Sequence, residues 1–251
     1  MRRFARRPSG TPPTRTMGEP GGEPQTHEVD AARPADEIRR LTGVRRVVAR
    51  RMTEAWQTIP AVTLHRPLPM ARLIELRAAH AEAAGHKLSL DALLAAAVAR
   101  ALTEHPLLNG SWLDAELAVA VHRLRNIAVA VDTPQGLTAV VLREADTRSP
   151  LELHAELVEM VERARARRSV PSDLADATFT ITNLGGLGID TFTPIITPPQ
   201  AAVLGIGRVA GPGVAGRPAH VSLTFDHRVA DGADAARFLA ALGERIAHLC
   251  L

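Results

Sequence analysis

The 251-residue sequence contains a single cysteine, Cys250, a single lysine, Lys87, and no tyrosine. One cysteine excludes an intrachain disulfide and a cysteine-based metal cluster, which is typical of a protein of the reducing cytoplasm. Aromatic residues make up only 3% of the chain, so few rings are available for stacking on nucleic-acid bases. No run of about 18 apolar residues occurs, which predicts no transmembrane helix. We therefore expect a cytoplasmic protein that binds neither nucleic acid nor a membrane.

The charge of the chain is nearly balanced. It has 30 Lys and Arg residues against 27 Asp and Glu residues, for a net charge of +3. This balance does not indicate a nucleic-acid partner. The hydrophobic fraction of 46% is sufficient for a substantial buried core.

Several familiar catalytic and cofactor motifs are missing. The sequence has no G-x-S-x-G serine elbow, no H-E-x-x-H zinc motif and no G-x-x-x-x-G-K-[ST] phosphate loop. Gly205-Ile-Gly207 lacks the third glycine of a dinucleotide-binding motif. The ten histidines show no ligand spacing, so we expect no metal site.

The composition divides the chain into two parts. Residues 1–37 are rich in Pro, Gly and Arg and have almost no large apolar side chain, which predicts a disordered tail or linker. The arginines at the start are similar to those of a transit peptide, but the apolar face of a targeting helix is missing. Residues 38–251 alternate between helical and strand patterns and are expected to form one globular domain.

Periodicity predicts an α/β domain in which a mixed β-sheet is flanked by helices. Helices are expected at 44–56, 73–84, 90–104, 150–168 and 233–249. Strands are expected at 61–66, 117–121, 126–131, 137–142, 178–182, 201–206 and 221–225. The first helix carries Val47, Val48 and Trp56 on one side, which predicts an apolar face.

Two places in the sequence could carry chemistry. His227 ends a predicted strand, and Asp231 follows four residues later, an arrangement suited to a positioned general base. Alternatively, His227 is a structural histidine and Asp231 is the N-cap of the last helix. Thr182 lies beside a glycine-rich loop, and it could also be an ordinary strand threonine.

Six segments together resemble the catalytic domain of the dihydrolipoyl acyltransferases, the core component of 2-oxoacid dehydrogenase complexes. Asp226-His-Arg-Val-Ala-Asp-Gly232 is similar to the D-H-R-x-x-D-G signature of that family, and Phe179-Thr-Ile-Thr-Asn-Leu-Gly185 to its F-T-[IL]-[ST]-N-[LI]-G segment. The other four segments, in the family's order, are 41–45, 105–109, 126–136 and 192–200.

The resemblance implies a chloramphenicol-acetyltransferase-like fold and a homotrimer whose active sites lie between subunits. It implies transfer of an acyl group between a dihydrolipoyl carrier and coenzyme A. His227 would then be the general base, and Thr182 of the neighbouring subunit would stabilise the oxyanion. Asp231 would support the histidine loop. Thr182 stands where serine is commoner in the family.

The resemblance also implies five contacts to coenzyme A: Arg77, Ser89, Asp132, Asn183 and Gly207. Each residue also has a purely structural explanation, as a solvated helix charge, an N-cap, a turn residue or a turn glycine.

The printed sequence lacks the lipoyl and subunit-binding domains that usually precede this core, and Lys87 does not lie in a lipoyl hairpin. We therefore expect the lipoyl group to come from another chain, a lipoyl-domain protein working with 2-oxoacid dehydrogenase components. Assembly beyond a trimer is left open. Two alternatives remain: a coenzyme A-dependent acetyltransferase acting on a small molecule, and a scaffold core without catalytic activity.

Overall fold

The computed structural model describes residues 39–134 and 136–251. The tail predicted for residues 1–37 lies outside the described residues. The described helices are α1 (Gly43–Thr58), α2 (Ala71–Ala84), α3 (Leu90–Glu104), α4 (Pro150–Arg165) and α5 (Gly232–Ala247), with short 3-10 helices η1 (Pro106–Asn109), η2 (Pro171–Asp173) and η3 (Gly185–Leu187).

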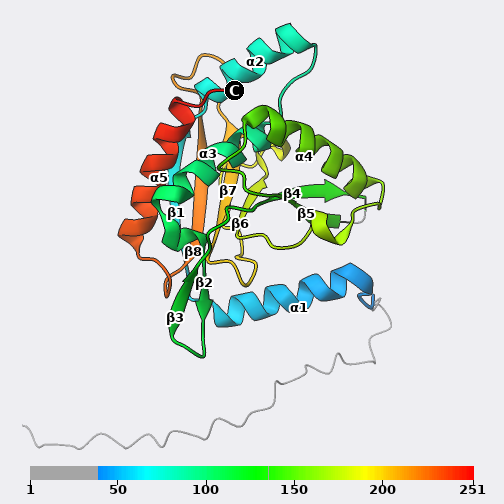
Figure 1. Ribbon diagram of the computed structural model, residues 1–251, viewed down its shortest axis with the longest axis vertical. Coiled ribbons are helices and arrows are strands. Elements are labelled where there is room, and N and C mark those ends of the chain that lie inside the picture. The colour runs from blue at the N-terminus through cyan, green and yellow to red at the C-terminus, as the bar shows by residue number, and fades with distance from the viewer. Residues whose placement is uncertain (1–38, 135) are drawn as a thin grey trace, which may run out of the picture. The chain divides into compact units, whose positions relative to one another are not determined.

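A six-stranded mixed sheet forms the centre of the domain (Figure 1), in the order β1-β8-β7-β6-β4-β5. Its strands are β1 (Ala61–Pro69), β4 (Ile127–Thr133), β5 (Gly136–Leu142), β6 (Phe179–Asn183), β7 (Ala202–Val209) and β8 (Pro218–Asp226). Strands β4, β6 and β7 run parallel, and the pairs β1–β8, β7–β8 and β4–β5 are antiparallel. The mixed sheet predicted from the sequence is confirmed.

The helix ends follow the signals in the sequence. The Ser89 hydroxyl accepts the Ala92 N–H at the start of α3. Ser149 and Glu152 form a reciprocal capping box at α4, which satisfies two backbone N–H groups that the helix itself leaves unpaired. Helix α2 ends at Gly85, whose φ of 77° is accessible to glycine at little cost.

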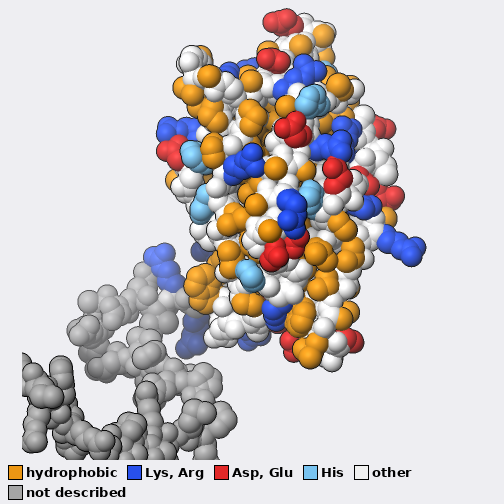
Figure 2. All heavy atoms as spheres, turned by 90° about the vertical axis from the view of Figure 1, so that its left-hand side faces the viewer, with side chains coloured by type: hydrophobic (Ala, Val, Ile, Leu, Met, Phe, Trp, Pro, Cys, Tyr) orange, Lys and Arg blue, Asp and Glu red, His pale blue; other side chains and the backbone are white. Residues whose placement is uncertain are grey.

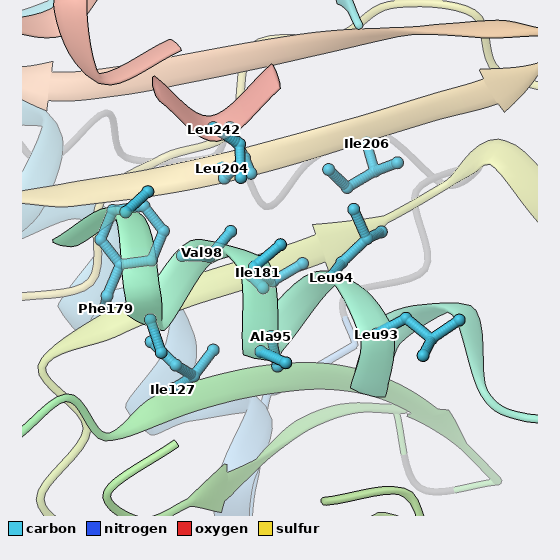
Figure 3. Packing of buried hydrophobic residues seen from close by; sticks show 14 of the residues in the cluster. Leu93, Leu94, Ala95, Val98, Ile127, Phe179, Ile181, Leu204, Ile206 and Leu242 are labelled. Carbon is cyan, nitrogen blue, oxygen red and sulfur yellow. The ribbon is translucent and has the colours of Figure 1, made fainter. Parts of the chain in front are cut away.

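One face of the sheet is covered by helices α3, α4 and α5 (Figure 1). Helix α3 lies in the middle of this layer and packs against both α4 and α5. Leu94, Ala95 and Val98 of α3 face Ile127 and Ile181 of the strands, as Figure 3 shows. The buried cluster extends across β4, β6, β7 and β8 into α5. This apolar layer fixes the strand ends, where the candidate site residues lie.

The opposite face of the sheet carries polar side chains. Thr63 and Thr224 have hydroxyl oxygens 2.8 Å apart, and His65 Nδ1 lies 2.8 Å from the Ser222 hydroxyl. Ser222 and Thr224 are buried. Because buried hydroxyls are costly unless they have partners, these pairs fix the register of β1 against β8.

Helix α1 presents much of its apolar face to solvent. The helix forms, but the side chains of Val47, Val48 and Trp56 are 52%, 45% and 76% exposed. Among the side chains described on this helix, Ala55 is buried and Met52 is half-buried. The predicted helix is confirmed, and much of its apolar face is exposed in the part of the chain that the structure describes.

A separate two-stranded sheet is formed by β2 (Gly110–Leu113) and β3 (Ala118–Val121). The sequence predicted β3 and missed β2, which is only four residues long. On the surface shown in Figure 2, side chains of both charge signs are interspersed with apolar ones. None of the described helices is long and apolar enough to cross a membrane.

The buried position of Leu204 generates a stability prediction. Leu204 lies on the central strand β7 and is fully buried against the helices. Leu204→Ala should lower the free energy of unfolding by about 2–5 kcal/mol, because the cavity left in the core cannot collapse fully. Val170→Ala, at an exposed position, should change it by less than about 0.5 kcal/mol. Urea unfolding measures both, and similar losses in the two variants would contradict this core assignment.

Candidate active site

His227 lies directly after β8, at one end of the sheet. Its backbone N–H donates to the carbonyl oxygen of Pro60 at 3.1 Å. The imidazole is exposed, and its ring centre is 5.9 Å from that of Phe225. The backbone is therefore fixed while the ring remains accessible, as a general base needs to be.

Asp231 is the N-cap of α5. Its carboxylate accepts the Asp234 N–H at 2.8 Å, and Asp234 accepts the Asp231 N–H at 3.2 Å. The capping role considered as the alternative is thus the one its side chain performs in this structure. The cap starts α5 four residues after His227 and so limits the length of the histidine loop.

Thr182 lies near the carboxyl end of β6, half-buried and on the polar face of the sheet. Its register partner is Gly205 on β7, which is paired in turn with Ser222 on β8. His227 is five residues beyond Ser222 and two strands across from Thr182. At about 3.3 Å per residue and 4.8 Å per strand, the two Cα atoms are about 19 Å apart. One chain therefore cannot place both side chains on the same atom.

Asp132 and Asn183 end the parallel strands β4 and β6, so they lie at the same edge of the sheet. The N-terminus of α3 meets this edge. A cavity of about 400 Å³ is lined there by Ser89, Asp91 and Asp132, together with side chains of α4 that include Arg165. Crevices at the carboxyl ends of parallel strands are common ligand sites, and a helix N-terminus favours anionic groups.

Two of the predicted coenzyme A contacts, Ser89 and Asp132, line this cavity, and two others, Arg77 and Asn183, bind residues next to it. Asn183 donates to the Asp91 carboxylate at 2.7 Å and accepts the Gly185 N–H at 2.9 Å. The guanidinium of Arg77 donates to the Leu88 carbonyl at 2.8 Å, next to Ser89. The structure thus brings Arg77, Ser89, Asp132 and Asn183 together at one edge of the sheet.

Gly207 contributes close backbone packing. A Cβ atom at this position would lie 1.8 Å from the Asp190 carbonyl oxygen, so no larger residue fits. The glycine loop approaches here too, since a Cβ on Gly185 would lie 2.5 Å from the Gly207 carbonyl oxygen. Gly207 thus lets the loop after Asn183 pack closely against β7.

Asp91 lines the cavity and accepts a hydrogen bond from Asn183, but it was not among the residues predicted for the site. Burial raises the pKa of its carboxyl above the ordinary value of 3.8, although the hydrogen bond from Asn183 and the charge of Arg77 act in the opposite direction. An acidic residue in the first turn of a helix is usually read as favourable for the helix dipole. Its position at the cavity depends on the fold and has no signal in the local sequence.

Another cavity, of about 560 Å³, lies beside the histidine loop. Trp112, Gln200, Asp226 and Arg228 are among its lining residues. Gln200 accepts a hydrogen bond from the Thr180 hydroxyl at 2.6 Å. No role was predicted for these residues from the sequence. Asp226 and Arg228 flank His227 in its motif, whereas the approach of Trp112 to this loop has no local sequence signal. Among the described residues, no group of three or more His, Cys, Asp or Glu side chains could hold a metal ion.

Comparison with known proteins identifies the class. The sequence profile of the 2-oxoacid dehydrogenases acyltransferase (catalytic domain) family matches residues 33–250. The acetyltransferase component of the Corynebacterium glutamicum pyruvate dehydrogenase complex is 34% identical over 227 residues, covering 82% of this chain and 33% of that protein. The chain thus spans about a third of that relative's length.

Solved structures agree with this assignment. A structure of the Azotobacter vinelandii dihydrolipoamide acetyltransferase has a TM-score of 0.80 at 35% identity, covering 90% of this chain and 97% of that one. A truncated catalytic core from Thermoplasma acidophilum has a TM-score of 0.79 at 34% identity, covering 85% and 99%. The chain belongs to the 2-oxoacid dehydrogenase acyltransferase family, and it has the fold of that family's catalytic domain.

The raised pKa of Asp91 generates a pH-dependent prediction. The folded protein binds this proton more tightly than the unfolded chain, so the stability that it contributes at low pH is lost as the pH rises through the folded pKa. Asp91→Asn removes the titration, and the new amide oxygen can still accept from Asn183. The variant should gain stability relative to wild type between about pH 4 and pH 7.

Urea unfolding at the two pH values measures this difference. The control is Asp132→Asn, which makes the same change of charge at an exposed position. A relative loss of stability by the Asp91 variant as the pH rises would contradict the assigned cause.

Proposed function

We propose that this chain transfers an acyl group between a dihydrolipoyl carrier and coenzyme A, as the catalytic core of a 2-oxoacid dehydrogenase complex. The observation that carries the proposal is the exposed His227 with Asp231 four residues later. The Azotobacter vinelandii structure was solved to test a serine, a histidine and an asparagine in its catalytic mechanism, and the last two are also four residues apart. Family membership makes that spacing meaningful for this chain.

The imidazole of His227 would act as the general base. A free thiol has a pKa of about 8.5, so it is mostly protonated at neutral pH and needs a base to become a good nucleophile. The imidazole takes the proton from the coenzyme A thiol, and the sulfur attacks the carbonyl carbon of the acyl-dihydrolipoyl thioester. Collapse of the tetrahedral intermediate breaks the old carbon–sulfur bond, and the imidazolium returns the proton to the departing dihydrolipoyl sulfur. The reverse reaction uses the same groups.

Thr182 would stabilise the oxyanion of the tetrahedral intermediate. A hydroxyl donor aimed at the developing charge contributes about 10²-fold or more to the rate. Because Thr182 and His227 are about 19 Å apart in one chain, the donor must come from a neighbouring copy. We therefore propose a homotrimer with active sites between subunits, and leave a larger assembly open.

Coenzyme A would bind at the edge of the sheet formed by Asp132 and Asn183. The cavity there is lined by Ser89 at the N-terminus of α3, which offers N–H donors to phosphate oxygens. Arg77 lies beside it and supplies a positive charge. The Gly207 contact keeps the loop after Asn183 close to β7.

Asp231 would support the reaction indirectly, because its cap at the start of α5 ends the histidine loop.

The acyl group would arrive on the lipoyl group of a lipoyl domain. The single lysine of the printed sequence, Lys87, lies in the connection between α2 and α3, which is not a hairpin suited to lipoylation. A lipoyl-domain protein and 2-oxoacid dehydrogenase components are therefore the proposed partners. The cytoplasmic location expected from the sequence stays a prediction.

Activity of purified protein with acetyl-, succinyl- and branched acyl-CoA and free dihydrolipoamide tests the function. His227→Ala should lower kcat by about 10²- to 10⁴-fold, because the proton acceptor is lost. Thr182→Ala should lower it by about 10²-fold, while Thr182→Ser should retain most of the activity because the hydroxyl remains. His248→Ala, at an exposed position near the C-terminus, is the control and should be unchanged.

Full activity of His227→Ala would refute the assigned base. Absence of turnover by the wild type with every donor would refute the transferase itself and favour a scaffold core. Transfer to a small amine or alcohol, with dihydrolipoamide unused, would favour the small-molecule alternative.

A further inference from the structure

The two residues on either side of the histidine of the proposed site, Asp226 and Arg228, form an ion pair. The side chain of Asp226 is only 3% exposed, and it precedes His227 directly. Arg228, the next residue after His227, donates from Nε to both carboxylate oxygens at 3.0 and 3.2 Å and from Nη2 to Oδ2 at 2.7 Å. These hydrogen bonds raise the pKa of Arg228. The mechanism described above uses neither charge.

The β2–β3 hairpin contacts the guanidinium of Arg228 through Trp112. The centre of the Arg228 guanidinium lies 5.1 Å from the ring centroid of Trp112, within the range of a cation–π contact. Trp112 Nε1 donates to Asp114 at 3.0 Å, and Asp114 lies 3.8 Å from Arg228. The hairpin and the histidine loop, which are more than 100 residues apart in sequence, are thus joined through one side chain.

Asp226 also organises the backbone of the loop. Its carboxylate accepts the Arg228 N–H at 3.0 Å, and its carbonyl oxygen accepts the N–H groups of Val229 and Ala230 at 2.9 and 3.2 Å. His227 lies inside this set of bonds, with its own N–H bound to Pro60. Loss of the pair would therefore free the segment that carries the imidazole.

We propose that Asp226, Arg228 and Trp112 form a charge-neutral clamp that positions His227 for proton transfer. They are positioning residues, since none of them is required to touch the reacting atoms. The inference deepens the proposed function and rests on it, because it assumes that His227 is the base.

The neutrality of the clamp matters for the adjacent imidazole. Asp226 and Arg228 are the residues on either side of His227, so an uncompensated charge on either of them changes the electrostatic potential at the ring. An uncompensated carboxylate favours the protonated ring, and an uncompensated guanidinium disfavours it. Arg228 is paired with Asp226. The other charged side chains around the loop are Glu54 of α1 and Asp114, which line the cavity beside it, and Asp231 and Asp234 at the start of α5, where Asp234 is paired with Arg237.

The test compares variants with opposite charge changes, using the pH profile of kcat/KM for transfer between acetyl-CoA and dihydrolipoamide. Arg228→Met leaves the carboxylate uncompensated. It should shift the acid limb of the profile, the fall of kcat/KM at low pH, to higher pH by roughly 0.5 pH unit or more. Asp226→Asn leaves the guanidinium uncompensated and should move it down by a similar amount. The double variant is again neutral and should return the limb close to its wild-type position, although the maximal rate stays lowered about 10-fold or more by the looser loop.

Two further variants separate charge from geometry. Trp112→Leu removes the stacking partner without a change of charge, so it should lower kcat and leave the acid limb in place. Arg228→Lys keeps the charge but not the planar two-pronged donor. It should restore the position of the acid limb and only part of kcat.

The chain offers a matched control in Arg163 and Asp173. This pair has the same two-pronged geometry, with distances of 3.0 and 2.9 Å, and a similarly buried carboxylate. It joins α4 to η2, and neither residue has a proposed role in the site. Arg163→Met should lower the thermal midpoint, as Arg228→Met does, and leave the pH profile unchanged.

The clamp is overturned if Arg228→Met and Asp226→Asn leave the acid limb in place, or move it in the same direction, while the wild type is active. The same holds if Trp112→Leu retains full kcat. If the proposed function itself is wrong, the result is different: the wild type has no acyltransferase activity, or His227→Ala is fully active. Thermal midpoints of all variants identify any that do not fold.

Discussion

The strand register of the central sheet is the constraint on which the rest of the account depends. Thr182, Gly205 and Ser222 are aligned across β6, β7 and β8, while His227 lies beyond the far end of β8. The two side chains of the proposed mechanism are therefore held at different places on a rigid sheet. The apolar layer of α3, α4 and α5 fixes this arrangement, because slipping a strand by one residue would turn its buried side chains to the polar face. The proposed site, with a hydroxyl and an imidazole at one carbonyl, therefore requires a second copy of the chain.

The polar parts of the site are stabilised in two distinct ways. At the carboxyl ends of the parallel strands, Asp91 and Asn183 form a hydrogen-bonded group around a cavity, and burial of Asp91 is unfavourable for its charged form. At the other end of the sheet, Asp226 is compensated fully by Arg228. A buried charge is tolerated where a partner satisfies it and costs stability where it is only partly satisfied. The first arrangement suits a ligand-binding edge, and the second suits a loop that must keep one geometry.

Much of the fold could be predicted from local signals. Ser89, Ser149 and Asp231 cap their helices as the sequence indicated, because a cap depends only on residues within one turn. Strand β2 was missed because four residues give too short an alternation to recognise. The exposure of Trp56 on α1 could not be predicted, since periodicity shows that a face is apolar and not what covers it. The contact of Trp112 with Arg228 is equally invisible to local patterns, because it joins distant parts of the chain.

Subunit complementation tests the central claim most directly. His227→Ala and Thr182→Ala chains, each nearly inactive alone, are unfolded together, refolded as an equal mixture, and assayed for acyl transfer. If each site takes its imidazole from one chain and its hydroxyl from the next, random assembly restores about a quarter of the wild-type activity per site. Activity no greater than the average of the two separate variants, in oligomers shown to contain both chains, would contradict an active site shared between subunits.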